Sequence, residues 1–109
     1  MSLLTKEFEF TQLTAPGFSE HVRCDKYIHH TIQYTIASVD TNVVLRAEGS
    51  IDGVNWFNLA SDGSDVTETT NGTDAFTVTN MAIRYIRLRF VSESGGTAAT
   101  IDARYIGQR

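Results

Sequence analysis

The chain has 109 residues, of which 41% are hydrophobic and 20% charged, and its formal net charge at pH 7 is −4. This length is enough for one two-layer core but leaves little room for a second domain or a deep cleft. The acidic balance argues against a general nucleic-acid binder, because such proteins need cationic surface for the phosphates. No apolar run reaches the length of a membrane span, so we expect neither a nucleic acid nor a membrane as a partner.

The single cysteine and the start of the chain indicate where the protein is made. Cys24 alone cannot close an internal disulfide, so packing must hold the fold. Charged residues at Lys6, Glu7 and Glu9 follow Met1-Ser2-Leu3-Leu4, where a secretory signal would have an apolar core. We therefore expect synthesis in a cytoplasm.

The sequence pattern favours strands along the whole chain. Thr occurs fourteen times and Pro once, and no window carries a helical apolar period for more than about a turn. Alternating apolar and polar residues predict strands over 6–14, 27–38, 43–51, 56–59, 75–79, 83–91 and 100–106. Residues 18–25 are short and mixed, and 60–73 is either a mobile loop or contains one short strand near 66–69. Seven to eight strands at this spacing predict one all-β domain over 1–109, a two-layer antiparallel sandwich with 1–13 as an arm or edge strand.

The alternation also assigns an inward face to each long strand. The predicted inward residues are Phe8, Phe10, Ile28, His30, Ile32, Tyr34, Ile36, Val43, Leu45, Ala47, Ile51, Ile86, Leu88, Phe90, Ile101, Ala103 and Tyr105. The outward positions of 43–51 are Val44, Arg46, Glu48 and Ser50.

Two motifs stand out in the middle and later part of the chain. The first is Ser50-Ile51-Asp52-Gly53-Val54-Asn55-Trp56, in which Asp-Gly predicts a tight turn between two strands, with a positive φ at the glycine. The second is Arg84-Tyr85-Ile86-Arg87-Leu88-Arg89, which alternates cationic and apolar residues.

Together these motifs resemble those of the galactose-binding-like jelly rolls, which include the discoidin or coagulation-factor type C domains. A Ser-x-Asp-Gly-x-x-Trp turn and an Arg-Tyr-aliphatic-Arg strand recur in that family. The resemblance implies that Trp56 fills space between the sheets and that Arg84 or Arg87 pairs with a carboxylate. This chain departs from the family in being shorter than is common and in having one cysteine.

The C-terminal run from Arg84 to Ala103 is also similar to small tailed-bacteriophage virion proteins of this general fold. This resemblance implies a structural protein of a phage particle. The fold alone does not decide the function, because it hosts sugar-binding, lipid-binding and purely structural members.

Residues with catalytic or metal-binding chemistry form no recognisable motif. His29 and His30 are adjacent on a predicted strand and so point to opposite faces, which favours a packed, hydrogen-bonded His30 over a metal site. Cys24 lacks an oxyanion motif and fits a small structural residue. Asp62, Asp65 and Glu68 could bind calcium, but they lack a calcium-loop register and fit a solvated acidic loop better. We predict a non-enzyme with no catalytic residues, no cofactor and no metal site.

The outward residues Tyr85, Arg87 and Arg89 form a cationic and aromatic stripe, to which Arg46 and Arg104 add from other outward positions. The stripe is either a docking surface for a partner's carboxylates or for a glycan, or a cross-strand ladder with Glu48 and Asp102. The ladder is the preferred interpretation. The residues predicted to contact a partner or a glycan are Trp56, Phe57, Asn58, Tyr85, Arg87 and Arg89.

Two functions fit these observations. The first is a non-catalytic structural protein of the virion, either capsid decoration or a neck or tail component. It would contact itself, with a trimer preferred, through residues 1–13 or an apolar sheet edge, and would also contact a major capsid or tail protein. The alternative is a carbohydrate-binding module for host-surface attachment, with Trp56, Phe57 and Asn58 meeting a surface glycan.

Overall fold

The structure is a computed structural model that describes residues 5–109, and all its regular elements are strands. They are β1 (Thr5–Glu9), β2 (Gly17–Phe18), β3 (Val22–Arg23), β4 (His29–Ala37), β5 (Asn42–Ser50), β6 (Phe57–Asn58), β7 (Val66–Glu68), β8 (Gly72–Val78), β9 (Tyr85–Ser94) and β10 (Thr100–Gln108). Residues 5–109 contain no helix long and apolar enough to cross a membrane.

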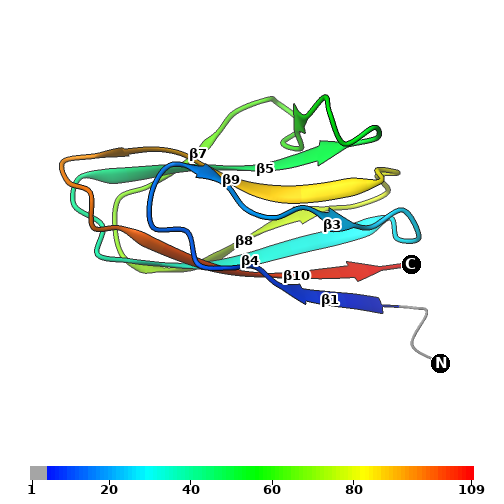
Figure 1. Cartoon of the computed structure of the whole chain (residues 1–109), viewed down its shortest axis with the longest axis horizontal. Helices are drawn as coiled ribbons and strands as arrows, with labels where there is room; N and C mark the ends of the chain where they lie inside the picture. The colour runs from blue at the N-terminus through cyan, green and yellow to red at the C-terminus, as the bar shows by residue number, and fades with distance from the viewer. Residues whose placement is uncertain (1–4) are drawn as a thin grey trace.

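The strands form two antiparallel sheets packed face to face, so the predicted all-β, two-layer sandwich is confirmed (Figure 1). Sheet A has the order β1-β10-β4-β8. Sheet B has the order β2-β9-β5-β6, and β3 also pairs with β9 and β7 with β5. Ten strands are described where seven to eight were predicted, because β2, β3, β6 and β7 are pieces of two or three residues that single-sequence alternation resolves poorly.

The N-terminal segment supplies an edge strand. β1 pairs only with β10, in a register that places Thr5 opposite Gln108 and Glu9 opposite Arg104. The strand predicted over 6–14 ends at Glu9. Beyond it, a hydrogen bond from the Phe10 N–H to the Ala103 carbonyl and an isolated bridge between Leu13 and Ile101 continue the pairing with β10. Residues 1–4 of the predicted N-terminal arm lie outside the described residues.

The core lies between the sheets and is made largely of the predicted inward residues. The largest fully buried side chains on these faces are Tyr34, Tyr105, Phe90, Ile32, Leu45, Ile86, Leu88, Ile101 and Val43. Two inward predictions are wrong. Ile28 is 41% exposed because β4 begins only at the next residue, and Ile51 is 61% exposed because β5 ends at Ser50.

The polar segment 60–73 contains the predicted short strand. β7 covers Val66–Glu68 and pairs with β5, which places Val43 opposite Glu68 and Leu45 opposite Val66. The next strand, β8, begins at Gly72, three residues before the predicted start, and crosses to the free edge of sheet A. The segment from β5 to β7 therefore arches over the outer side of sheet B (Figure 1).

Candidate functional site

The chain leaves β5 through a loop that Asp52 holds in place. Its Oδ1 accepts hydrogen bonds from the backbone N–H groups of Val54 at 2.9 Å and Asn55 at 2.8 Å. The Gly53 N–H donates to Ser50 Oγ at 2.8 Å, and Gly53 has the predicted positive φ, 77°. The donated hydrogen bonds, those from Asn55 and Val54 above all, hold the pKa of the Asp52 carboxyl well below its usual range.

This loop is longer than the tight two-residue turn that Asp-Gly predicted. β5 ends at Ser50 and β6 begins at Phe57, which pairs with Gly49, so the connection between the two strands runs over 51–56. The predicted strand 56–59 is correspondingly reduced to Phe57–Asn58. The loop is held by the hydrogen bonds that the Asp52 side chain accepts from the backbone, as in an Asx-type turn, and not by the backbone hydrogen bonds of a short hairpin.

The loop presents apolar side chains to solvent. Ile51 is 61% exposed, Val54 78% and Phe57 43%, and we call these three residues the apolar tip. They come from seven consecutive positions on a loop whose backbone is held by internal hydrogen bonds. Such a rigid apolar surface is a feature of protein contact sites, because little conformational entropy is lost when it binds.

Trp56 packs outside sheet B rather than between the sheets. The Arg87 guanidinium lies between two aromatic rings, 3.9 Å from the centroid of Trp56 and 3.8 Å from that of Phe18. His21 is the next neighbour, with its ring centroid 5.8 Å from that of Trp56. The implied position of Trp56 in the inter-sheet core is therefore wrong. On the outer face the indole stacks on a flat guanidinium and its N–H can reach water, whereas the apolar core between the sheets would offer neither.

Glu48 is the centre of the charged network on this face. It points away from the core as predicted, yet it is only 2% exposed. Its Oε1 accepts from Arg87 Nε at 2.8 Å, and its Oε2 lies 3.3 Å from Arg46 Nη1 and 3.5 Å from Arg89 Nη1. The predicted ladder between Glu48 and the arginine stripe is thus present, and the register places Glu48 directly opposite Arg87.

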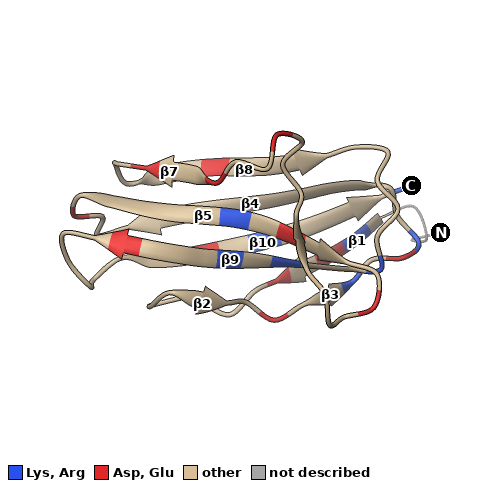
Figure 2. Cartoon of the chain, turned by 90° about the horizontal axis from the view of Figure 1, so that it is seen from above, with Lys and Arg blue, Asp and Glu red and all other residues tan. Residues whose placement is uncertain are grey.

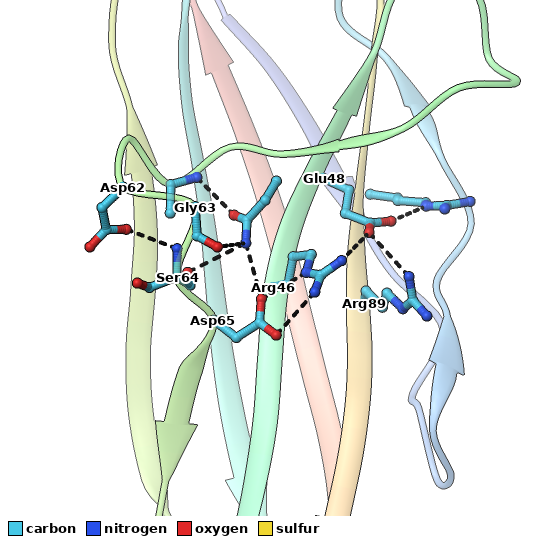
Figure 3. A network of polar contacts seen from close by, with 10 residues as sticks. Arg46, Glu48, Asp62, Gly63, Ser64, Asp65 and Arg89 are labelled. Atoms are coloured by element: carbon cyan, nitrogen blue, oxygen red, sulfur yellow. Dashed lines mark hydrogen bonds and ion pairs between the residues drawn. The ribbon is translucent and has the colours of Figure 1, made fainter.

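Arg46 extends this network to residues 51–65, which fold back over sheet B and which we call the covering segment (Figure 3). Its Nε and Nη2 donate to the two carboxylate oxygens of Asp65 at 2.8 and 3.0 Å, a two-pronged contact. The hydrogen bond from Arg46 lowers the pKa of Asp65, and the hydrogen bond to Asp65 raises the pKa of Arg46. The contact therefore fastens the 51–65 segment to sheet B.

Asn58, predicted as a partner contact, uses its side chain within the same segment. Its Nδ2 donates to Asp65 Oδ1 at 3.0 Å and to the Gly63 carbonyl at 3.2 Å. Its Oδ1 accepts from the Ala60 N–H at 2.9 Å. Asn58 thus shapes the covering segment, and its amide has little capacity left for a ligand.

Arg104 and Asp102 do not belong to this network. Both lie on β10, in the other sheet, where Arg104 Nη2 contacts Glu9 Oε2 at 3.2 Å and Asp102 accepts from Gln12 Nε2 at 3.1 and 3.2 Å. The predictions that Arg104 adds to the stripe and that Asp102 forms its ladder are wrong. Outward alternation identifies a face but not the sheet to which that face belongs.

Figure 2 views sheet B from above and shows the result: basic residues lie in the central parts of the neighbouring strands β5 and β9. The outer face of sheet B thus combines three arginines and a buried carboxylate, and the loop that carries Ile51 and Val54 rises above it (Figure 1). Tyr85 lies on the same face, with its ring centroid 5.2 Å from that of His21. Of the six predicted contact residues, the structure brings Trp56, Asn58, Arg87 and Arg89 into one network.

Asp62, Asp65 and Glu68, the acidic residues that could bind calcium by their type, each contact a different partner. Asp62 Oδ1 accepts from the Ser64 N–H at 2.9 Å, Asp65 pairs with Arg46, and Glu68 Oε2 accepts from the Tyr34 hydroxyl at 2.6 Å. Within residues 5–109, no group of three or more His, Cys, Asp or Glu side chains is placed to hold a metal ion.

The two remaining candidates are internal. His30 is 1% exposed, with Nδ1 2.7 Å from the Tyr105 hydroxyl and Nε2 3.1 Å from the Met81 carbonyl, which confirms the packed, hydrogen-bonded prediction. Burial lowers the pKa of His30. Cys24 is fully buried, and burial raises the pKa of its thiol to about 12, so the thiol stays protonated at neutral pH.

Sequence reasoning missed a groove at the open edge of the sandwich. It has a volume of about 510 Å³ and lies between the segment 59–62 and residues 75–79 of β8 and its C-terminal continuation. Its lining includes Leu59, Asp62, Phe76 and Met81. Phe76 and Val78 alternate with threonines in the sequence, but only the path of 59–62 across the sheet edge creates the groove.

No known family model matches the sequence, and no curated protein matches it. Solved structures do match its fold. The SPBc2 prophage-derived protein YomS aligns over 96% of this chain and 93% of its own, with a TM-score of 0.66 and 13% identity. The C-terminal CBM6 of LamC, a laminarinase from Zobellia galactanivorans, aligns over 95% and 99%, with a TM-score of 0.56 and 11% identity.

A Bacillus endospore appendage protein, from a family of disulfide-linked pili, also aligns over 96% of this chain and 88% of its own, with a TM-score of 0.51 and 12% identity. These likenesses define the class of the fold. The protein has a galactose-binding-like β-sandwich of the kind also found in carbohydrate-binding modules. At these identities, the similarity establishes the architecture alone.

Proposed function

We propose that this protein is a non-catalytic structural component of a bacteriophage particle that acts through protein–protein contacts. The observation that carries the proposal is the apolar tip, three exposed apolar side chains on a loop held rigid by Asp52. An exposed apolar group on a preorganised loop suits a partner protein, since burial supplies affinity at a small entropic cost.

The charged groups of the same face support this proposal over a sugar site. Arg87 lies between Trp56 and Phe18, so it covers one face of each ring on which a sugar would otherwise stack. The amide of Asn58 is used within its own segment. The prophage origin of YomS and the appendage origin of the pilus protein are further support, because both share the fold over nearly the whole chain.

In this proposal the partners are other copies of the chain and a major capsid or tail protein, and the protein resides in the virion after synthesis in the host cytoplasm. It has no enzymatic activity. The trimer preferred from the sequence stays a prediction.

The experiment is the molar mass in solution, measured by light scattering behind a sizing column over a wide dilution range. We expect a closed or extended homo-oligomer that survives dilution. The same experiment on a variant with Ile51→Ser and Val54→Ser should show weaker assembly. A wild-type protein that stays monomeric at every concentration, and that binds neither capsids nor tails of a phage encoding it, would contradict the proposal.

A second function, carbohydrate binding, is favoured by one observation, the 510 Å³ groove beside β8. It combines the ring of Phe76 with the side chains of Ser61, Asp62, Thr77 and Thr79, the mixture of aromatic and hydroxyl groups that sugar sites use. Calorimetric titration with cello- and laminari-oligosaccharides tests it. Heat of binding that disappears in Phe76→Ala but persists in Phe57→Ala would favour this function and place the sugar in the groove rather than at the apolar tip.

A further inference from the structure

The outer faces of the two sheets carry opposite charge. On sheet B, the arginines of β5 and β9, Arg46, Arg87 and Arg89, contact the carboxylates of Glu48 and Asp65, so this cluster keeps one positive charge. Arg23 of β3, opposite Tyr85 on the same face, is paired with Asp25. The cluster is a local cationic surface in a protein whose formal net charge is −4. Arg89 is its most accessible cation, with 37% of its side chain exposed and a contact to Glu48 of 3.5 Å.

On sheet A, the charged outward side chains of β1 and β10 are Glu7, Glu9, Asp102 and Arg104, which leaves two negative charges. The Glu9–Arg104 contact is on the open surface, with side-chain exposures of 67% and 68%. This face is therefore an accessible acidic surface on the opposite side of the same molecule.

On both faces the apolar groups lie at one end of the sandwich, and the charged groups lie farther from that end. β5 and β10 both end at one end of the sandwich (Figure 1). At that end sheet B continues into the apolar tip, and sheet A carries Ile106, 42% exposed and paired with Glu7. Moving away from this end, the charges follow: Glu48 and then Arg46 on β5, and Arg104 and then Asp102 on β10.

We propose that copies of this chain stack head to tail, with the outer face of sheet B of one copy on the outer face of sheet A of the next. In that arrangement the apolar tip meets Ile106, and Arg89 meets the carboxylates of β1 and β10. A two-fold contact of either face with itself would instead bring like charges together, which is unfavourable. The inference deepens the proposed function, since it names the surfaces through which the protein assembles with itself.

The two faces lie on opposite sides of the sandwich, so the contact repeats in one direction. A heterologous contact of this kind forms an open row, or a ring larger than a trimer, rather than a closed pair. The proposal therefore predicts a different molar mass from the trimer preferred on the sequence.

The test uses two charge-changed variants of the full chain. The first carries Thr67→Glu with Arg89→Gln, which makes the sheet B face acidic; Thr67 is exposed on β7, opposite Val44. The second carries Glu7→Lys with Asp102→Lys, which makes the sheet A face basic. Lys26→Gln, which removes one positive charge from the exposed turn between β3 and β4, outside both sheets, is the control. Circular dichroism verifies that each variant is folded, and Thr67→Glu alone is the fallback if the first variant is not.

Light scattering at low salt should show wild-type and Lys26→Gln protein in assemblies that grow with concentration. Each charge-changed variant alone should dissociate at concentrations at least about tenfold higher than wild type. An equimolar mixture of the two variants should assemble again. The acidic sheet B face of the first variant can then bind the basic sheet A face of the second, and the unchanged basic sheet B face of the second can bind the unchanged acidic sheet A face of the first.

Three outcomes would overturn the stacking. They are a discrete wild-type trimer, variants that assemble as well as wild type, and a mixture that stays dissociated. Each of these leaves self-assembly, and with it the proposed function, intact. Only a wild-type protein that is monomeric throughout counts against self-assembly itself.

Discussion

The outer faces of the two sheets use the same kind of contact, an arginine with a carboxylate, in two different environments. On sheet B, Glu48 is almost fully buried and shared among three arginines. On sheet A, Glu9 and Arg104 meet with about two thirds of each side chain exposed. The covering segment 51–65 makes the difference, because it shields one face from water and leaves the other open. The buried contacts of Glu48 on sheet B therefore contribute to the stability of the fold. The exposed Glu9–Arg104 contact on sheet A contributes chiefly to the surface charge.

The largest expected effect comes from Glu48→Gln, which breaks this comparison at its buried side. The amide keeps the shape but removes the charge that compensates Arg46, Arg87 and Arg89, and we expect a loss of about 3 kcal/mol in the free energy of unfolding. Urea denaturation followed by tryptophan fluorescence measures it.

The matched control is Glu9→Gln on sheet A, where the exposed pair should contribute less than about 0.5 kcal/mol. Similar losses for Glu48→Gln and Glu9→Gln would show that the cover over sheet B does not matter energetically.

An intermediate effect is expected from Trp56→Ala, which removes one of the two rings around Arg87. We expect a loss of about 1–2 kcal/mol from the lost cation–π contact and apolar burial. Phe57→Ala, at the neighbouring exposed position, should cost clearly less. The same urea experiment, read by circular dichroism because the only tryptophan is removed, gives both values. Equal losses would mean that Trp56 is no better packed than its exposed neighbour.

The smallest expected effect concerns His30, a buried ionisable group on the inner side of sheet A. It is neutral, in contrast to the buried, charged Glu48 of sheet B. The pKa of His30 lies below its ordinary value of 6.5, so the unfolded chain binds a proton at a higher pH than the folded protein does. The stabilisation from a neutral His30 is therefore complete above pH 6.5 and decreases as the pH falls below it. Thermal unfolding of wild type and His30→Gln between pH 7.5 and 5 should show a smaller pH dependence for the variant, and identical slopes would contradict this origin.

Most of the long strands could be predicted from alternation alone. The inward faces of β4, β9 and β10 follow a strict period of two, and the buried residues Tyr34, Leu88 and Ile101 lie where that period puts them. Such a signal depends only on neighbouring residues, which is why it is visible in one sequence.

The cover over sheet B could not be predicted in the same way. Glu48 and Ser50 occupy outward positions, yet both are buried, because the chain folds back over them after β5. Trp56 resembles a core residue by type and family motif, but its partners Arg87 and Phe18 come from segments more than thirty residues away. The arginine stripe and its pairing with Glu48 were predicted from alternation; the burial of Glu48 was not.

The position of β10 bears on how the protein is synthesised. β10 lies between β1 and β4, so the first described strand has its only described partner in the last described strand. Sheet A cannot close while the ribosome still holds residues 100–108, and until then the apolar faces of β1 and β4 remain open to other chains. We therefore expect the nascent chain to need rapid synthesis of β10, or a chaperone, and truncation within β10 should yield aggregates rather than a smaller folded product.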